Sequence, residues 1–408
     1  MKVLVLNCGS SSLKFQLIDS HAASVSGGRE NKLARGLIDR IGDRATCMFT
    51  AAGCPPHRET TAIRNHEEAV RKVLSWLDSK DDSGLGKVEA VGHRVVHGGD
   101  RFTASVLIDD EVDAAIDSLK DLAPLHNPAC LSGIRAARAV LSSAIPMVAV
   151  FDTAFHRTLP DYASSYAIPY DLSLRHGIRR YGFHGLAHSY LAQRYAVIRA
   201  IPIDRVNIVT LHLGNGCSAS AIRQGKSVDT SMGFTPLEGL VMGTRSGDLD
   251  PALVGYLALK EGLSVVEVET LLNKRSGLLG ISGWSHDMRE LMERAKGDGR
   301  ARLAIEMFCY RARKYLGAYL AAVGGAEAVV FSGGIGENSP AVRAKVCDGM
   351  QWCGLSLDSG RNEAVMGNEG QISSDGARIH AYVIPTDEEI VIAGETAGVV
   401  EKSKSTLG

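Results

Sequence analysis

The sequence lacks any apolar run long enough to cross a membrane, and its N-terminus enters a strand-like segment without a signal-peptide pattern. It also lacks an excess of either charge, since 45 Lys and Arg residues stand against 46 Asp and Glu residues. A basic excess would indicate nucleic-acid binding and an acidic excess a solvating tail. We therefore expect a globular protein with neither a membrane nor a nucleic acid as partner.

The cysteines lack the C-x-x-C spacing that is typical of metal or redox sites, although the chain has 8 of them. In a chain of this size they are expected to be buried thiols of a reducing compartment. The sequence therefore predicts a cytoplasmic protein.

The length of 408 residues is large for a single hydrophobic core, so two domains are expected. A hydrophobic content of 45% and a charged content of 22% are ordinary for a globular protein. Segments with strand patterns alternate with segments with helix patterns along the chain. This alternation predicts the α/β class. Asn127 is expected to cap a helix that has Pro128 in its first turn.

Two strand–turn–strand segments are the most informative feature of the chain. The first runs through Val3–Leu6, the Gly/Ser turn Asn7–Ser12 and Leu13–Asp19, and the second runs from Val206 to Arg223 around Gly214–Ser218. Each predicts a hairpin whose tip exposes small hydroxyls and backbone N–H groups, which suits a polyphosphate. Because the two are about half a chain apart, they indicate duplicated halves with a polar cleft between them.

Two familiar nucleotide-binding motifs are excluded. No G-x-x-x-x-G-K-[ST] sequence is present, so this is not a P-loop protein. Gly214–Ala219 fits G-x-G-x-x-A, but the short segment before Gly225 leaves no room for the helix that this motif requires. A hairpin is the better interpretation.

Polar residues also follow two other predicted strands. Asp152 follows the apolar segment Met147–Phe151, and Gly333–Asn338 follows Ala328–Phe331 as a Gly-rich loop before a helix opened by Pro340. Open α/β sheets bind ligands at the carboxyl ends of their strands, and a helix N-terminus favours an anion. Both places are therefore candidate ligand contacts.

The histidines and arginines add candidates for anion binding. His184 and His188 are four residues apart but lack the glutamate of H-E-x-x-H, so no structural zinc is expected. His184 and His212 adjoin Gly-flanked turns, where an imidazole can donate to a phosphate oxygen. Arg94 and Arg245 lie among Gly, Ser and small apolar residues, which favours bidentate anion binding over simple solvation.

These residues together resemble the acetokinase family, within the sugar kinase/heat-shock protein/actin superfamily. The matching stretches occur in order along the chain: 7–14, 92–99, 124–128, 151–156, 180–185, 212–216, 232–251, 332–338 and 385–389. Asp387 departs from the family, which commonly has Asn there. The signal is specific because the spacing of the stretches also matches.

The resemblance implies a fold of two duplicated ribonuclease H-like, actin-like ATPase domains that flank an interdomain active-site cleft. The first domain would comprise residues 1–150 with 386–408, because the C-terminal helix returns to it, and residues 151–385 would form the nucleotide-binding domain. The resemblance also implies a homodimer.

The resemblance further implies direct, reversible in-line transfer of the γ-phosphoryl group of ATP to acetate, giving acetyl phosphate and ADP, with Mg²⁺ or alternatively Mn²⁺. Arg94 would contact the acetate carboxylate, His184 and Arg245 would stabilise the transition state, and Asp152 would be the proton donor or acceptor. Asn7 and Glu388 would be associated with the metal. The nucleotide contacts would be Lys14, His212, Leu213, Gly214, Asn215, Gly216, Asp287, Met288, Arg289, Gly334, Ile335, Gly336, Glu337 and Asn338. The methyl pocket would comprise Val96, Leu125, Phe183 and Pro236.

One implied role conflicts with elementary chemistry. Acetate is already ionised at neutral pH, so no base is needed to activate it. We therefore expect Asp152 to orient metal-bound water or an arginine. Two other functions stay open: a propionate or butyrate kinase of the same family, and an actin-like nucleotide-binding module without catalysis.

Overall fold

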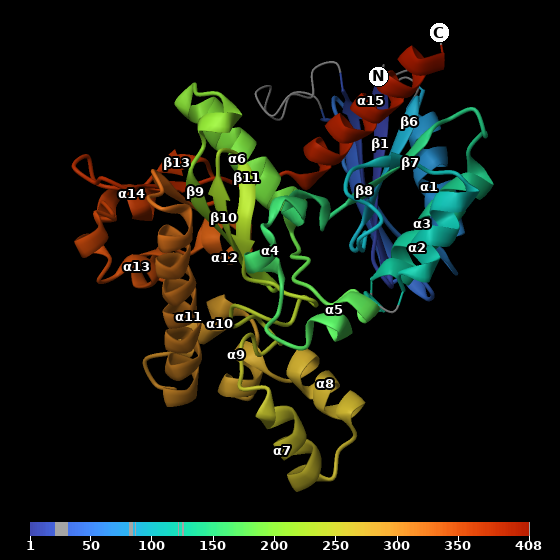
Figure 1. Ribbon diagram of the computed structural model, residues 1–408. Coiled ribbons are helices and arrows are strands. Elements are labelled where there is room, and N and C mark those ends of the chain that lie inside the picture. Colours follow the sequence, from blue (N-terminus) through green and yellow to red (C-terminus); the bar gives the residue numbers. More distant parts are fainter. Residues whose placement is uncertain (21–31, 81–84, 86, 121, 125, 408) are drawn as a thin grey trace. The chain divides into compact units, whose positions relative to one another are not determined.

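The computed structural model describes the chain except for residues 21–31, 81–84, 86, 121, 125 and 408. The described chain divides into two compact units, Met1–Ala154 with Asp387–Gly408, and Phe155–Thr386. Each unit contains a mixed β-sheet with helices packed on it, so the α/β prediction is confirmed (Figure 1). The roles predicted for residues 1–150 with 386–408 and for 151–385, and the cleft between them, stay predictions.

The first unit has an eight-stranded sheet with the strand order β5-β4-β3-β2-β1-β6-β8-β7. Its elements are β1 (Lys2–Cys8), β2 (Ser12–Asp19), β3 (Lys32–Asp39), β4 (Arg44–Ala51), β5 (His57–Ala62), α1 (His66–Asp78), β6 (Ala90–Val95), β7 (Val106–Leu107), α2 (Asp110–Ser118), α3 (Asn127–Val140), β8 (Met147–Phe151) and α15 (Glu388–Leu407).

The first hairpin is confirmed as β1 and β2. They pair antiparallel with Cys8 opposite Leu13, and the backbone N–H of Gly9 donates to the carbonyl of Ser12 within the turn (2.9 Å). Four residues of β1 in a row, from Val3 to Leu6, are buried, as expected for a strand covered on both faces. β1 then pairs in parallel with β6, and β6 in parallel with β8.

Helices pack against this sheet or against one another beside it. α3 packs on β1 and β6, and α15 packs on β1, β6 and β8 (Figure 1). Gly92 of β6 permits the approach of α15, because a Cβ there would lie 2.4 Å from Thr396 Oγ1 and 2.7 Å from Ile392 Cγ2. α1 packs on α3, and Trp76 of α1 contacts the rings of Phe15 and Phe49 in the core.

The second unit has a six-stranded sheet with the order β11-β10-β9-β12-β14-β13. Its elements are α4 (Asp161–Ser164), α5 (Tyr170–His176), α6 (Gly185–Arg199), β9 (Ile208–Leu213), β10 (Cys217–Arg223), β11 (Lys226–Thr230), α7 (Ala252–Glu261), α8 (Val265–Lys274), α9 (Gly277–Ser282), α10 (Met288–Arg294), α11 (Gly299–Val323), β12 (Ala328–Ser332), α12 (Gly333–Asn338), α13 (Pro340–Cys347), α14 (Ser359–Ala364), β13 (Gly370–Gln371) and β14 (His380–Val383). Short 3₁₀ helices occur at Ala154–Thr158, Ile203–Arg205 and Gln351–Cys353.

The two sheets repeat one topology. In the second unit β9 and β10 form the predicted hairpin, β11 extends it on one side, and β12 and β14 add in parallel on the other. The first unit has the same arrangement in β3-β2-β1-β6-β8. The prediction of duplicated halves, made from two similar hairpins, is therefore matched by duplicated strand order.

Two local predictions differ from the structure. The segment Gly333–Asn338 was expected to be a loop but forms the short helix α12. Asn127 was expected to cap α3 but is its first residue, and its side chain instead bonds both backbone groups of His97 (3.1 and 3.0 Å). In both cases a tertiary contact competes with the local pattern, since α12 packs on β9 and Asn127 holds a neighbouring loop. None of the helices that the structure describes is both long and apolar enough to cross a membrane.

Candidate functional site

The parallel strands of the first unit bring three predicted site residues to one edge of the sheet. Leu6 of β1 lies beside His93 of β6, and Val95 of β6 beside Phe151 of β8. Asn7, Arg94 and Asp152 come at or next to these positions, where the carboxyl ends of the strands meet. The register of the sheet therefore assembles residues that are far apart in the sequence.

Arg94 and Asp152 form a bidentate ion pair. Nη2 of Arg94 donates to Oδ2 of Asp152 (2.5 Å) and Nε to Oδ1 (3.2 Å). Asp152 is 1% exposed, so this pair is largely withdrawn from water. The sequence predicted an anion for Arg94, and within this unit the anion that meets it is the carboxylate of Asp152.

A second carboxylate adjoins the pair. Glu388, the first residue of α15, lies 3.8 Å from Nε of Arg94 through Oε2. Burial raises the pKa of Glu388, and the carboxylates of Asp152 and Glu389 act in the same direction while Arg94 opposes them. One guanidinium thus faces a buried and a partly buried carboxylate, and the excess negative charge suits an additional cation.

The donor chemistry of this edge fits a hard divalent metal. Carboxylate and amide oxygens, which Glu388, Asp152 and Asn7 supply, are the ligands that Mg²⁺ and Mn²⁺ prefer. No group of three or more His, Cys, Asp and Glu side chains in the described parts of the chain could hold a metal by itself. A metal here would therefore need water or a ligand to complete its coordination.

The three acidic residues at the start of α15 are each paired with a cation from a different strand. Asp387 bonds Lys32 of β3, Glu388 lies near Arg94 of β6, and Glu389 meets Lys14 of β2 (2.5 Å). Lys14, which was predicted to contact the nucleotide, is thus an ion-pair partner of Glu389 while its side chain is 53% exposed.

In the second unit the strand ends assemble the predicted nucleotide segments. β9 and β12 pair in parallel with His212 beside Ser332, and Nδ1 of His212 lies 3.1 Å from Oγ of Ser332. Gly333 follows with φ +75°, and a Cβ there would lie 2.6 Å from the carbonyl oxygen of Leu213. The segments 212–216 and 334–338 are therefore adjacent, and Gly333 makes their close approach possible.

His184 and Arg245 meet at Gly216, the tip of the second hairpin. A Cβ on Gly216 would lie 3.5 Å from both Nε2 of His184 and Nη2 of Arg245. His184 precedes α6 with φ 54°, a backbone conformation that non-glycine residues rarely adopt. The structure thus brings together an imidazole, a guanidinium and a bare glycine backbone.

Arg245 is a cation whose side chain is bonded by neutral groups. Its Nη1 donates to the carbonyl of Pro236 (2.9 Å), and no ion pair within the described residues involves it. Burial lowers the pKa of Arg245, because the charged guanidinium loses contact with water and gains no anionic partner among the described residues. An anion beside Gly216 would offset that loss.

The remaining predicted contacts are less closely gathered. Asp287, Met288 and Arg289 form the start of α10, where the Arg289 guanidinium pairs with Asp287 (2.6 Å) and α10 packs on α11. Of the predicted methyl pocket, Phe183 is buried and Pro236 bonds Arg245, both in the second unit, whereas Val96 belongs to the first unit. Leu125 lies outside the described residues, so the pocket stays a prediction.

Arg343 of α13 was missed by the sequence analysis. It is 0% exposed and its guanidinium donates to the carbonyls of Gly336 (2.9 Å) and Glu337 (3.0 Å) in α12. Its other donors reach Asn362 Oδ1 (2.8 Å) and the carbonyls of Asn362 (2.6 Å) and Val365 (2.7 Å). Burial lowers the pKa of Arg343 to about 10. The sequence feature that could have identified Arg343 is its position between the apolar residues Val342 and Val346 in a segment predicted to be helical.

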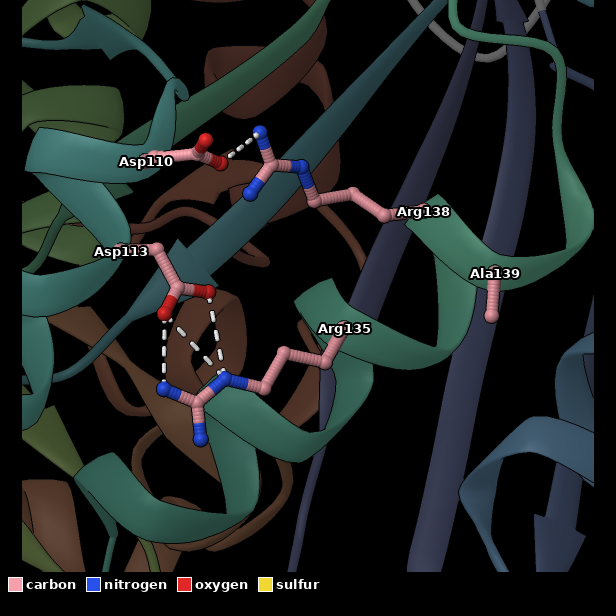
Figure 2. A pocket seen from close by; sticks show the side chains of 5 residues that line it. All are labelled: Asp110, Asp113, Arg135, Arg138 and Ala139. Carbon is pink, nitrogen blue, oxygen red and sulfur yellow. Dashed lines mark hydrogen bonds and ion pairs between the residues drawn. The ribbon is translucent and has the colours of Figure 1, made fainter.

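A hollow of about 600 Å³ between α2 and α3 contains none of the predicted site residues (Figure 2). Its charges pair with one another, Arg135 with Asp113 (2.7 Å) and Arg138 with Asp110 (3.1 Å). Because these ion pairs are internally satisfied, the hollow offers no unpaired charge to a ligand.

The matches to known proteins extend over nearly the whole chain. The model of the acetokinase family matches residues 2–394. An acetate kinase of Solibacter usitatus is 55% identical, with 97% of each chain covered. The crystal structure of Porphyromonas gingivalis acetate kinase matches with a TM-score of 0.89 at 44% identity, covering 98% of this chain and 99% of that one. A propionate kinase from Francisella tularensis matches with a TM-score of 0.89 at 42% identity, over 98% and 99% of the two chains.

We expect Arg343→Lys to lower the free energy of unfolding by about 2–4 kcal/mol, because a lysine cannot satisfy the carbonyls that the guanidinium bonds. Amide hydrogen exchange in α12 should accelerate, since two of those carbonyls belong to it. Thermal unfolding and hydrogen exchange measure both effects. Arg361→Lys is the matched control, because Arg361 is 41% exposed on neighbouring α14 and should matter little. Equal stability of the two variants with unchanged exchange in α12 would contradict the role of Arg343.

Proposed function

The chain belongs to the acetokinase family, and from this premise we propose that it transfers the γ-phosphoryl group of ATP reversibly to acetate, giving acetyl phosphate and ADP. The observation that carries the proposal is the cluster at Gly216, where His184 and Arg245 lie beside the hairpin tip and no acidic side chain among the described residues pairs with Arg245. The phosphoryl group supplies the anion that this cluster lacks.

Phosphoryl transfer to a carboxylate requires mainly positioning and charge stabilisation. Two anions must approach each other, so the donors around the transferred group reduce their repulsion. His184 and Arg245 serve the phosphoryl oxygens, and Arg94 serves the acetate carboxylate. In direct in-line transfer the carboxylate oxygen forms a bond to phosphorus as the bond to the ADP oxygen breaks.

Asp152 acts in this mechanism through Arg94. Acetate is ionised at neutral pH and has no proton to lose, so a general base has no task. The bidentate bonds from Arg94 to Asp152 instead fix the plane of the guanidinium (3.2 and 2.5 Å). A fixed plane lets the remaining donors of Arg94 meet the substrate in one orientation.

The nucleotide is held by the strand ends of the second unit. The segment His212–Gly216 supplies glycine backbone at the hairpin tip, and Gly334–Asn338 supplies the first turn of a short helix next to it. Asp287, Met288 and Arg289 at the start of α10, together with Lys14, complete the proposed contacts. The backbone N–H groups of the hairpin tip and of the first turn of α12 can donate hydrogen bonds to phosphate oxygens.

We assign Asn7 and Glu388 to the metal, with Mg²⁺ as the ion and Mn²⁺ as a substitute. The excess of carboxylate over guanidinium charge around Arg94 supports this assignment. When bound, the metal would offset the negative charge of the phosphate groups. Asn7 and Glu388 would hold it from two elements of the first unit.

Acetate is the preferred substrate in this proposal, with propionate as the alternative. The methyl pocket of Val96, Leu125, Phe183 and Pro236 would discriminate against one further methylene by only roughly 10–200-fold. The likeness to a propionate kinase supports keeping this alternative.

All eight cysteines are free thiols, which supports a reducing, cytoplasmic location.

The ATP-dependent formation of acyl phosphate, trapped as the hydroxamate, tests the proposed function. Acetate should give the highest kcat/KM, propionate a lower one and butyrate the lowest, because the pocket is built for one methyl group. A higher kcat/KM for propionate would favour the alternative. Formation of no hydroxamate from any of the three acids would leave a nucleotide-binding module without this catalysis.

We expect Asp152→Asn to lower kcat/KM by about 100-fold or more, because the amide no longer fixes Arg94 by charge. The dependence of the rate on acetate and on magnesium should change with it. Asp113→Asn is the matched control, since Asp113 also forms a bidentate pair with an arginine of the same unit, in a hollow that none of the predicted site residues lines (Figure 2). An Asp152→Asn enzyme with unaltered acetate and magnesium dependence would overturn the assignment.

A second copy of this chain is the proposed protein partner. The apolar side chains Leu253, Tyr256 and Leu259 of α7 and Val265 and Val266 of α8 are exposed, and the two helices pack on each other (Figure 1). An exposed apolar patch of this kind supports an interface, and the family resemblance supports a homodimer.

Sedimentation velocity should show a dimer, and Leu259→Glu should shift it towards the monomer because it places a charge in the patch. Leu259 is 82% exposed, so the substitution should leave the fold intact. Trp352→Glu is the control, since Trp352 is 77% exposed outside the patch and should leave the dimer unchanged. A monomeric wild type, or a Leu259→Glu protein that stays dimeric, would contradict the interface.

A further inference from the structure

A chain of buried hydrogen bonds lies behind His184. Nδ1 of His184 is 2.9 Å from Oγ of Ser218, and the same oxygen is 2.8 Å from Nε2 of His188. Nδ1 of His188 is in turn 2.7 Å from Oγ1 of Thr210. Ser218, His188 and Thr210 are all 0% exposed, and α6, β9 and β10 of the second unit supply the whole chain.

His188 is uncharged in this environment. Both of its ring nitrogens are engaged by hydroxyl oxygens, so neither can meet a carboxylate that would stabilise an imidazolium. The rings of His156 (5.7 Å) and His212 (6.4 Å) lie beside it. Burial lowers the pKa of His188 well below its ordinary value, and both neighbouring imidazoles act in the same direction. A neutral His188 carries one ring proton.

The neighbouring groups decide which nitrogen carries that proton. The carbonyl oxygen of Ser220 can only accept, and the hydroxyl of Thr210 donates to it (3.4 Å). Thr210 therefore accepts from Nδ1 of His188, and Nε2 of His188 is left without a proton. The single proton of Ser218 goes to that nitrogen, so Ser218 Oγ accepts from Nδ1 of His184.

We propose that His188 is a positioning residue which, through Ser218, keeps the proton of neutral His184 on Nδ1 and turns Nε2 towards Gly216 and Arg245. The inference rests on the proposed function, in which His184 meets the transferred phosphoryl group. Nε2 of the neutral ring has no proton to donate to a phosphoryl oxygen. His184 therefore acts at the phosphoryl group as an imidazolium, a second cation beside Arg245.

The position of the proton is measurable without any substrate. Two-bond ¹H–¹⁵N correlation spectra of histidine-labelled protein distinguish the two neutral tautomers, and His184→Gln identifies the His184 signals. At about pH 9, well above the ordinary histidine pKa of about 6.5, wild-type His184 should carry its proton on Nδ1. In Ser218→Ala the proton should move to Nε2, because the acceptor at Nδ1 is gone.

Ser220→Ala is the matched control for this measurement. Ser220 lies two residues further along β10, is equally buried, and bonds Ser227 and the carbonyl of Asp229 through its hydroxyl, while only its backbone carbonyl accepts from Thr210. Its His184 spectrum should equal that of the wild type. A wild-type His184 protonated on Nε2, or a Ser218→Ala spectrum like the wild type, would overturn the proposal. A failure of the proposed function would appear in the hydroxamate assay and leave these spectra unchanged.

Kinetics provide the second readout. Ser218→Ala should lower kcat by about 10–100-fold, as the loss of orienting partners does for metal-bound histidines, with the KM values for ATP and acetate roughly unchanged. Ser218→Thr, which keeps a hydroxyl, should restore most of the rate, and Ser220→Ala should keep it. Wild-type kcat in Ser218→Ala, or an equal loss in Ser220→Ala, would show that the hydroxyl of Ser218 has no special role.

Discussion

The register of the parallel strands is the constraint on which the other features depend. In each unit a hairpin supplies the first strand, and two further strands pair in parallel beside it. Because parallel strands end at the same edge of a sheet, the residues that follow them meet there. Arg94 meets Asp152 in the first unit for this reason, and His212 meets Ser332 in the second. A shift of one residue would turn these side chains to the opposite face of the sheet.

The two conspicuous arginines differ in how their charges are balanced. Arg94 is paired with Asp152 and lies near Glu388, so its surroundings carry excess negative charge. Arg245 has no ion-pair partner in the described part of the chain and is surrounded by backbone carbonyl, sulfur and glycine. The first arrangement suits a cation together with a small carboxylate, and the second suits a phosphoryl group. Burial strengthens the electrostatic effect of both arrangements, because it removes water that would otherwise screen the charges of Arg94 and Arg245.

Close backbone contacts determine which residues can occupy the site. Gly216 leaves room for His184 and Arg245, and Gly243 leaves room for the side chain of Asn215, which a Cβ there would approach to 2.1 Å. Arg343 then holds α12 from behind by bonding two of its carbonyls. The bonds from Arg343 explain why the segment Gly333–Asn338 is a short helix and not the loop expected from its glycines. In the helix, the carbonyls of Gly336 and Glu337 accept from the buried guanidinium.

The sequence by itself determined the α/β class, both hairpins, the strand that delivers Asp152, and the candidate residues Arg94, His184, His212 and Arg245, because these follow from local apolar patterns and turn chemistry. Only the tertiary structure decided that Asp152 is the partner of Arg94, that Lys14 pairs with Glu389, and that His188 reaches His184 through Ser218. These pairings join residues that are distant in the chain, and a sequence pattern holds no information on which side chains of two separate strands or helices come within hydrogen-bond distance. The roles of Arg343 and Asn127 escaped the sequence for the same reason, since a buried polar side chain is placed by the carbonyl and N–H groups that the fold brings to it.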